Sequence, residues 1–155
     1  MIDMQFLGSI DAKIDAKMRV FVPAAFRKVL QGQTQSALIL RKDIFQDCLV
    51  LYPVDVWDAE VQHLRGRLNR WDKSHQQLFR QFVVDAERLE IDASGRILIP
   101  KRYLQMIGAG SEIQFLGVDN TIEVWAKDRL SETLIDPSEF GMQIQEIMNK
   151  ENPNG

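Results

Sequence analysis

The chain has 155 residues, of which 45% are hydrophobic and 26% are charged, so it is long enough to bury a sizeable core. Its formal net charge of −3 excludes a protein that coats nucleic acid by bulk attraction, and any contact with DNA must therefore be local. No stretch approaches the roughly 20 apolar residues that cross a bilayer, and the first residues resemble neither a secretory nor a mitochondrial presequence. We therefore expect a cytoplasmic protein without a membrane partner.

The first predicted elements, within residues 5–53, are short strands around one short helix. A proline suits the start of a helix, and short apolar runs bounded by polar turns are typical of strands. The single Cys48 has no partner for an internal disulfide, so we expect a buried thiol in a strand. In chain order the predicted elements are strands at Gly8–Ile14 and Asp15–Pro23, a helix at Ala24–Leu30, and strands at Ala37–Leu40 and Cys48–Tyr52.

Residues 54–85 have a different period and predict a helical hairpin. The apolar residues recur at intervals of three and four, the seam of an amphipathic helix. They are Val54, Trp57, Val61, Leu64, Leu68 and Trp71. A second helix is predicted to begin near Asp72 or at Ser74, because Ser74 with Gln77 matches a capping box. His63 and His75 lie on this hairpin without a Cys or third His at metal-ligand spacing, so we expect no metal and no cofactor.

Residues 86–130 repeat the order of the first half. Asp92–Pro100 aligns without gaps to Asp15–Pro23, 77 positions earlier. In both segments an Asp precedes an Arg by four residues, and three apolar residues and a Pro follow the Arg. The remaining predicted elements are a strand at Ala86–Ile91, a helix at Lys101–Ile107 closed by Gly108, and strands at Glu112–Leu116 and Thr121–Trp125.

Each copy is therefore a β-β-α-β-β unit, and neither copy has enough core to be stable alone. A domain of about 60 residues already buries only about 60% of its surface, and each unit is shorter than that. We expect one α+β domain over residues 1–130 in which the strands of both copies interleave about a pseudo-two-fold axis. It comprises repeat 1 (5–53), the helical insert (54–85) and repeat 2 (86–130).

The C-terminal tail, residues 131–155, is predicted to be acidic and partly helical. Residues 128–155 carry six acidic and two basic groups, whereas residues 1–30 carry three acidic and five basic groups. Phe140, Ile144, Ile147 and Met148 fall at helical spacing. This helix is expected to pack on the body or on a neighbouring subunit, and the alternative is a frayed end, for which Asn152–Gly155 is typical.

Two such Asp–Arg segments around a helical insert resemble the MraZ family, and the resemblance covers nearly the whole chain. It is supported by Phe6-Leu7-Gly8, Leu51-Tyr52-Pro53 and Ile122-Glu123-Val124-Trp125. The resemblance implies a swapped-hairpin β-barrel like that of AbrB-type regulators, with each repeat standing for one subunit of an AbrB dimer. It also implies a nucleoid-associated regulator that forms a ring-shaped homo-oligomer and binds double-stranded DNA. Its sites would be repeated promoter boxes upstream of its own operon, the division and cell-wall gene cluster.

The chain departs from the family pattern at two positions. Met18 stands where the family has glycine in the first copy, and Ser94 stands where it has lysine in the second. If the glycine position requires a positive φ, Met18 would carry backbone strain of about 1 kcal/mol or more.

Arginine suits DNA contact because its planar fork binds phosphate or a guanine edge through two hydrogen bonds. Lys17 and Arg19 are predicted to share one face of a strand, and Asp15 is positioned to orient the Arg19 guanidinium. The open alternative is a purely structural Asp–Arg link. Basic residues at the start of the second helix oppose the helix dipole, which an anionic partner would relieve. The candidate DNA-binding residues are Lys13, Asp15, Lys17, Arg19, Arg27, Asp92, Arg96, Lys101 and Arg102.

Two other functions are weighed against DNA binding. One is an antitoxin-like protein of the same fold class, whose acidic tail would bind a protein partner. The other is an enzyme, but the sequence has no glycine-rich phosphate loop, no nucleophile elbow and no metal-ligand cluster. We therefore expect no catalytic residue.

Overall fold

Both repeats fold as two strands, a helix and two further strands, as predicted. The computed structural model describes residues 5–32 and 36–150. Repeat 1 contains β1 (Phe6–Lys13), β2 (Arg19–Phe21), α1 (Ala24–Leu30), β3 (Ala37–Lys42) and β4 (Leu49–Pro53). Repeat 2 contains β5 (Glu87–Glu90), β6 (Arg96–Leu98), α4 (Lys101–Met106), β7 (Glu112–Asp119) and β8 (Thr121–Ala126). The α+β class is confirmed.

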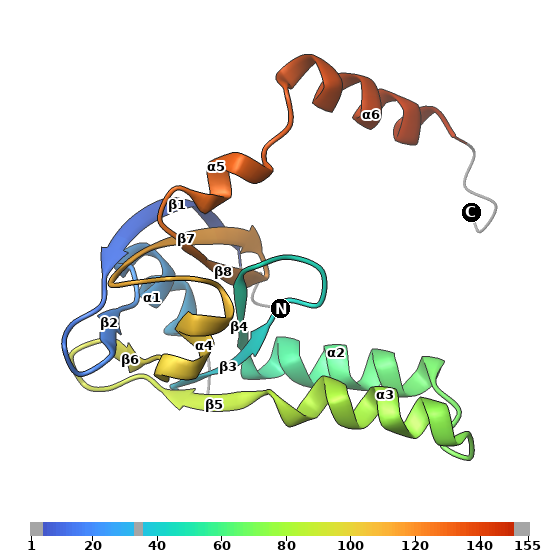
Figure 1. Ribbon diagram of the computed structural model, residues 1–155, viewed down its shortest axis with the longest axis horizontal. Coiled ribbons are helices and arrows are strands. Elements are labelled where there is room, and N and C mark those ends of the chain that lie inside the picture. Colours follow the sequence, from blue (N-terminus) through green and yellow to red (C-terminus); the bar gives the residue numbers. More distant parts are fainter. Residues whose placement is uncertain (1–4, 33–35, 151–155) are drawn as a thin grey trace.

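The strands of the two repeats pair with one another. A six-stranded antiparallel sheet has the order β1-β7-β8-β4-β3-β5, and β2 pairs with β6 in a separate two-stranded sheet. The first strand of each repeat pairs with the third strand of the other, β1 with β7 and β5 with β3. Exchanging the repeats therefore leaves every pairing unchanged, and the two strands β4 and β8 meet in the middle (Figure 1).

The main core draws its apolar side chains from both repeats. β7 buries the alternate residues Ile113 and Phe115, because successive side chains of a strand point to opposite faces, whereas β3 and β4 bury consecutive residues. Phe6 packs edge-on against Phe26 with ring centroids 5.6 Å apart, and Tyr103 and Phe115 are fully buried in the same cluster. Neither repeat encloses this core without the other.

The turn before β2 and the turn before β6 share an unusual backbone conformation. Met18 has φ 66° and Gly95 has φ 88°, so the glycine position does require the left-handed region that favours glycine. A Cβ on Gly95 would lie 2.5 Å from Arg27 Nη1 and 2.7 Å from its Cδ. Repeat 2 has Leu104 at the position of Arg27. The same turn therefore occurs with Gly95 and Arg27 in one case and with Met18 and Leu104 at the corresponding positions in the other.

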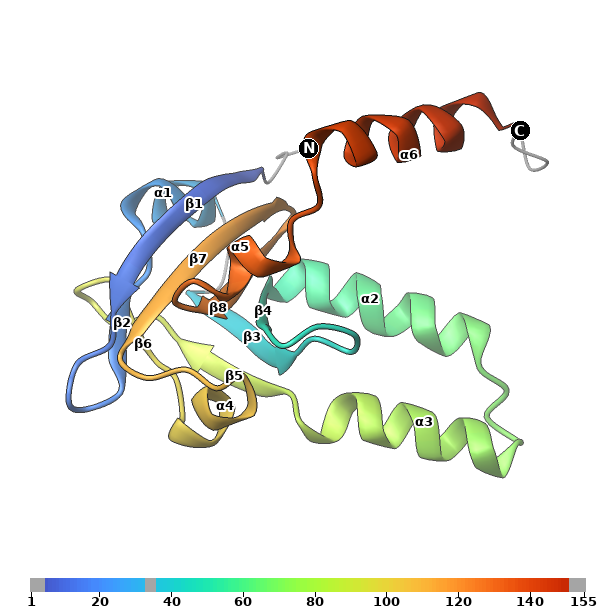
Figure 2. The ribbon, with the colours of Figure 1, turned by 45° about the horizontal axis from the view of Figure 1, so that its top comes forward.

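The helical insert consists of α2 (Val54–Arg67) and α3 (Lys73–Val84), which extend together from one end of the body (Figure 2). Of the two predicted starts for the second helix, Asp72 is correct. Its side chain accepts hydrogen bonds from the backbone N–H groups of Ser74 and His75, and the capping box at Ser74 is not formed. The hairpin is anchored by Trp57, which stacks on Phe82 with ring centroids 5.3 Å apart.

The expected starts of α1 at Ala24 and of α4 at Lys101 are confirmed, because Pro23 and Pro100 occupy the capping positions with an extended ψ. Two other sequence expectations need correction in detail. Cys48 is fully buried but lies just before β4 rather than in it. A helix that was not predicted, α5 (Arg129–Thr133), spans the expected boundary between repeat 2 and the tail.

The predicted tail helix is α6 (Pro137–Asn149), capped by the side chain of Asp136. All its residues are exposed. The predicted frayed segment Asn152–Gly155 lies outside the described residues. Within residues 5–32 and 36–150, every helix is too short or too polar to cross a bilayer.

We expect Gly95→Ala to lower the free energy of unfolding by about 1–3 kcal/mol, because alanine is strained at positive φ and its Cβ would displace Arg27. Urea denaturation measures this loss. In an Arg27→Ala background the steric part disappears and about 1 kcal/mol of backbone strain should remain. Gly110→Ala is the control, since a Cβ added there would have nothing within 4 Å and its φ is not in the left-handed region. Equal stability of Gly95→Ala and the parent would contradict this account of the turn.

Candidate nucleic-acid interface

The Asp–Arg pairs predicted from the sequence form in both repeats with nearly identical geometry. Asp15 Oδ1 accepts hydrogen bonds from the backbone N–H groups of Lys17 and Arg19, both at 2.9 Å. Its Oδ2 accepts from Arg19 Nε at 3.1 Å. One carboxylate therefore holds both the turn and the guanidinium that follows it.

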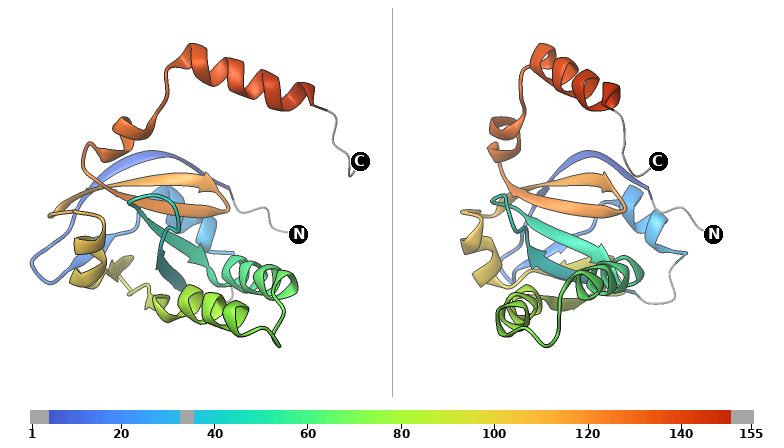
Figure 3. Two further views of the ribbon diagram at one scale, coloured as in Figure 1. Left: turned by 45° about the vertical axis from the view of Figure 1, so that its right-hand side comes forward. Right: turned by 90° about the vertical axis from the view of Figure 1, so that its right-hand side faces the viewer.

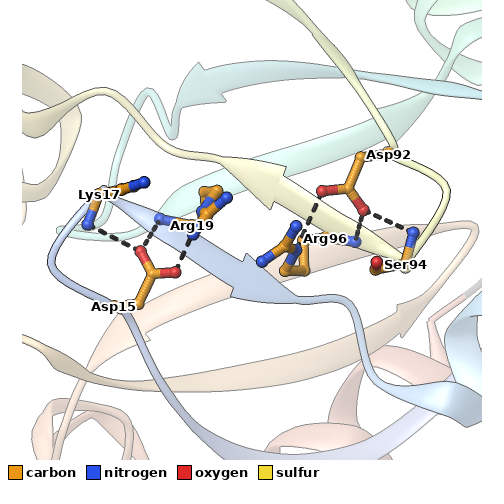
Figure 4. A network of polar contacts seen from close by, with 6 residues as sticks. All are labelled: Asp15, Lys17, Arg19, Asp92, Ser94 and Arg96. Carbon is orange, nitrogen blue, oxygen red and sulfur yellow. Dashed lines mark hydrogen bonds and ion pairs between the residues drawn. The ribbon is translucent and has the colours of Figure 1, made fainter.

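Asp92 repeats this arrangement in the second copy. Its Oδ1 accepts from the N–H groups of Ser94 and Arg96 at 2.9 and 2.8 Å, and its Oδ2 accepts from Arg96 Nε at 3.0 Å. In Figure 4 the two arginines lie on adjacent strands between the two carboxylates. Each Nε is engaged by its own Asp, which leaves the terminal guanidinium nitrogens for a partner.

These contacts also favour the charged form of each carboxylate. The backbone N–H of Arg19 is the main reason that the pKa of Asp15 lies below its ordinary value, with further lowering from the N–H of Lys17 and the Arg19 side chain. The pKa of Asp92 is lowered in the same way by Arg96 and Ser94. Both carboxylates are therefore ionised at neutral pH and remain ion-pair partners of the arginines.

The pairing of β2 with β6 sets which side chains reach the surface. Val20 pairs with Ile97 in the register, and both are buried in the core. Their neighbours point the opposite way, so Arg19 stands across from Leu98 and Phe21 stands across from Arg96 on the outer face. Phe21 is 56% exposed and Leu98 is 50% exposed. The face thus alternates two arginines with two apolar side chains.

Phe21 and Leu98 are surface residues that the sequence analysis did not single out. The strand alternation contained the signal, because a buried Val20 requires its neighbours to face outward. The Arg96 guanidinium carbon lies 5.8 Å from the centroid of the Phe21 ring. The aromatic ring therefore lies within reach of a cation–π contact with that arginine.

The lysines of the first copy are placed differently from the expectation. Lys17 lies in the turn and not on the strand with Arg19, because the Asp15 carboxylate binds its backbone N–H. Lys13 ends β1, which pairs with β7 and not with β2, and its register partner is Glu112. The positive groups of repeat 1 therefore do not follow a single hairpin.

The remaining candidates differ in their contacts. Arg27 is half-buried and donates from Nε to the carbonyl oxygen of Val22 at 2.9 Å. Arg102 donates to the hydroxyl of Tyr103 at 3.0 Å and lies 3.6 Å from the Glu87 carboxylate. Lys101 is exposed in the first turn of α4. Arg27 and Arg102 thus have roles within the fold, whereas Lys101 presents its charge to solvent.

The fold also brings together a group that the sequence analysis did not predict. Asp43, Cys48 and Glu123 place one potential ligand atom each within 4.8 Å of one another. Burial raises the pKa of the Cys48 thiol and that of Glu123, and both protonated forms are poor metal ligands. Cys48 packs with Trp125 and Leu130 in a small apolar cluster. We interpret the group as part of this packing, and the expectation of no metal stays a prediction.

Comparison with known proteins identifies the family. The model of the MraZ protein family, described as antitoxin-like, matches residues 5–80 and again residues 82–144. The Transcriptional regulator MraZ of Bacteroides fragilis is 55% identical over 96% of this chain and 94% of its own length. The protein of that name in Bacteroides thetaiotaomicron is 54% identical, with 96% of each chain covered.

A more distant relative shows the same extent of similarity. The Transcriptional regulator MraZ of Christiangramia forsetii is 33% identical over 98% of both chains. The relatives therefore match both repeats, the insert and most of the tail. The resemblance inferred from the duplicated Asp–Arg segments is confirmed, and the chain belongs to the MraZ family.

Proposed function

We propose that this protein is a sequence-specific, DNA-binding transcription regulator. Its sites would be repeated boxes upstream of its own operon, the division and cell-wall gene cluster. The observation that carries the proposal is the duplicated turn in which Asp15 and Asp92 hold Arg19 and Arg96 on two paired strands. The relatives bear the name of transcriptional regulators, which supports it and names no enzyme class.

A two-stranded antiparallel ribbon is one of the elements that fit the major groove of DNA. The outer face of β2 and β6 offers two arginine forks for guanine edges, and Phe21 and Leu98 provide apolar surface beside them. Lys17 and Lys101 are exposed near these strands and would contact phosphates. Lys13, Arg27 and Arg102 would contribute secondary contacts, since their positions or partners hold them further from the ribbon face.

We also propose a barrel fold and a single domain for the two repeats and the helical insert. We assign the pairing of β1 with β7 and of β5 with β3 to a swapped-hairpin, AbrB-like barrel in which residues 1–130 form one cooperative unit. Residues 131–155 form a separate acidic tail. Such an arrangement would place the two Asp–Arg turns beside the shared β2–β6 ladder.

We further propose that the protein acts as a ring-shaped homo-oligomer in the cytoplasm, associated with the nucleoid. One ribbon makes few phosphate contacts, and affinity grows with the number made together. Several identical ribbons on one ring would engage successive boxes, and the effective concentration of the later ones would raise the avidity.

A second candidate function is an antitoxin-like protein whose tail binds a protein partner. The observation that favours it is the exposure of every residue of α6, together with the antitoxin-like description of the family. Retention of the purified protein on a DNA column at low salt separates the two functions, because the antitoxin-like role does not require it.

Residues 1–53 and 86–130, expressed separately, are each expected to remain unfolded. Each fragment lacks the strands that pair with its own β1 or β5 and exposes half of the shared core. Amide NMR spectra of the two fragments test this expectation. Two well-dispersed spectra would show independent folding and would contradict a single interleaved domain.

Arg19→Ala is expected to weaken binding to the DNA upstream of the chain's own gene by about 1–3 kcal/mol for each lost base contact. Where only a phosphate contact is lost, the slope of log affinity against log salt should flatten by about one unit. Fluorescence anisotropy at several salt concentrations measures both. The melting temperature should barely change, because the Arg19 side chain is partly exposed.

The matched control is Arg67→Ala, which removes the same charge from the exposed end of α2, away from β2 and β6. It should leave DNA affinity unchanged. Unfolding of the Arg19→Ala variant would show that the Asp15–Arg19 pair is structural. Unaltered affinity of a folded Arg19→Ala variant would remove the ribbon from the interface.

Asp15→Asn is expected to lower the ratio of operator affinity to affinity for unrelated DNA. Asparagine still offers an oxygen to the N–H groups of Lys17 and Arg19 but loses the ion pair that orients the guanidinium. Removing a negative charge beside the DNA also favours binding to any sequence. Competition assays with both DNAs measure the ratio, and an unchanged ratio would mean that the carboxylate does not orient Arg19 for recognition.

A further inference from the structure

The apolar side chains of α6 are exposed, and those of the α2–α3 hairpin are only partly covered. No residue of α2, α3 or α6 is buried. Helices shorter than about 12–15 residues are marginal in water, and most helical stability in proteins comes from packing of an apolar face. The most complete case is α6, whose exposed large apolar side chains are Phe140, Met142, Ile144, Ile147 and Met148.

A groove lies between α2 and α3. Its volume is about 710 Å³, which is room for several side chains. Its apolar lining comes from Leu68, Phe79 and Val83. The polar lining residues are Gln62, Gln76, Arg65, Arg70 and Arg80, with Gly66 at the margin. None of these described lining residues is acidic, so the groove combines apolar side chains with three arginines.

The chemistry of α6 complements this groove. Phe140, Ile144 and Ile147 lie on one stripe of the helix, at spacings of four and three. Glu139 and Glu146 are the charged residues between Pro137 and Asn149. An acidic helix with an apolar stripe fits a groove that is lined by apolar side chains and three arginines.

The groove of the same molecule is out of reach of α6. In both views of Figure 3 the β-sheet body lies between α6 and the α2–α3 hairpin. The linker between α5 and α6 is Leu134–Asp136, and three extended residues span at most about 10 Å. In this structure α6 and the groove of its own molecule are apart, so we assign the groove that α6 fills to another molecule.

We propose that α6 of one copy of this chain docks into the α2–α3 groove of the next copy. The helix of one copy and the groove of the next are different surfaces of the molecule, so the contact is head-to-tail. Repetition of such a contact gives a closed ring if the rotation between copies closes, and a filament if it does not. This inference deepens the oligomer part of the proposed function and does not depend on DNA binding.

Two variants with complementary defects test the contact. Phe79→Glu places a negative charge in the apolar lining of the groove and leaves α6 unchanged. Ile144→Glu places a negative charge in the apolar stripe of α6 and leaves the groove unchanged. Each variant alone is expected to be monomeric in analytical ultracentrifugation, whereas the parent protein forms a larger assembly. An equimolar mixture at high protein concentration is expected to form a dimer, because one intact helix can enter one intact groove. Met142→Glu, on the opposite side of α6 from the stripe, should leave the parent assembly unchanged.

Circular dichroism and thermal melting first establish that each variant is folded, and Arg80→Glu replaces Phe79→Glu if that variant is not. Assembly of the groove variant alone would overturn the proposal, since α6 would then bind elsewhere. Two monomeric variants that stay monomeric when mixed would also overturn it. A monomeric parent protein would overturn both this contact and the proposed ring, and α6 would then be a binding site for a different protein. DNA affinity, measured on the same samples, tests the DNA-binding proposal separately.

Discussion

The pairing of β2 with β6 is the constraint on which the candidate site depends. Only three residues of each strand pair, and the central pair, Val20 with Ile97, is buried. Burial of this pair turns Arg19 and Arg96 outward from both repeats at once. The Asp15 and Asp92 carboxylates then hold each guanidinium against its own turn. Shared packing and local hydrogen bonds thus place two identical cations on one face, which neither repeat could do alone.

The two repeats reach this symmetry with unequal side chains. Gly95 permits close contact by Arg27, whereas repeat 1 has Met18 in the same left-handed conformation. Met18 packs against the core, and Leu104, which occupies the position of Arg27 in repeat 2, is buried. Contact with the core is the interaction in the structure that favours Met18 at this position despite its left-handed backbone.

Much of the fold could be predicted from the sequence, because the duplicated Asp–Arg–Pro pattern marks the same turn, strand and helix twice. The pairing partners of β1 and β5 could not be read from local periodicity, since register across repeats depends on the closed core. The position of Lys17 differs from the prediction for a local reason, because Asp15 binds the backbone N–H of Lys17 and thereby bends the chain into a turn. Strand alternation predicts that Phe21 and Leu98 are each exposed. Only the register between β2 and β6 shows that they lie on the same face.

The basic and acidic segments, which are separate along the chain, are also separate in the folded protein. The basic N-terminal region contributes the turn at Asp15 and strand β2 at one end of the body, and the helices α2, α3 and α6 extend from the other end (Figure 1). An acidic helix near the arginine face would repel DNA and compete for the guanidinium groups. Its separation from β2 and β6 keeps that face open. Contacts between copies through these helices would therefore leave every Asp–Arg turn of an assembly accessible, and the proposed assembly and the proposed recognition of DNA would use different surfaces of the same small protein.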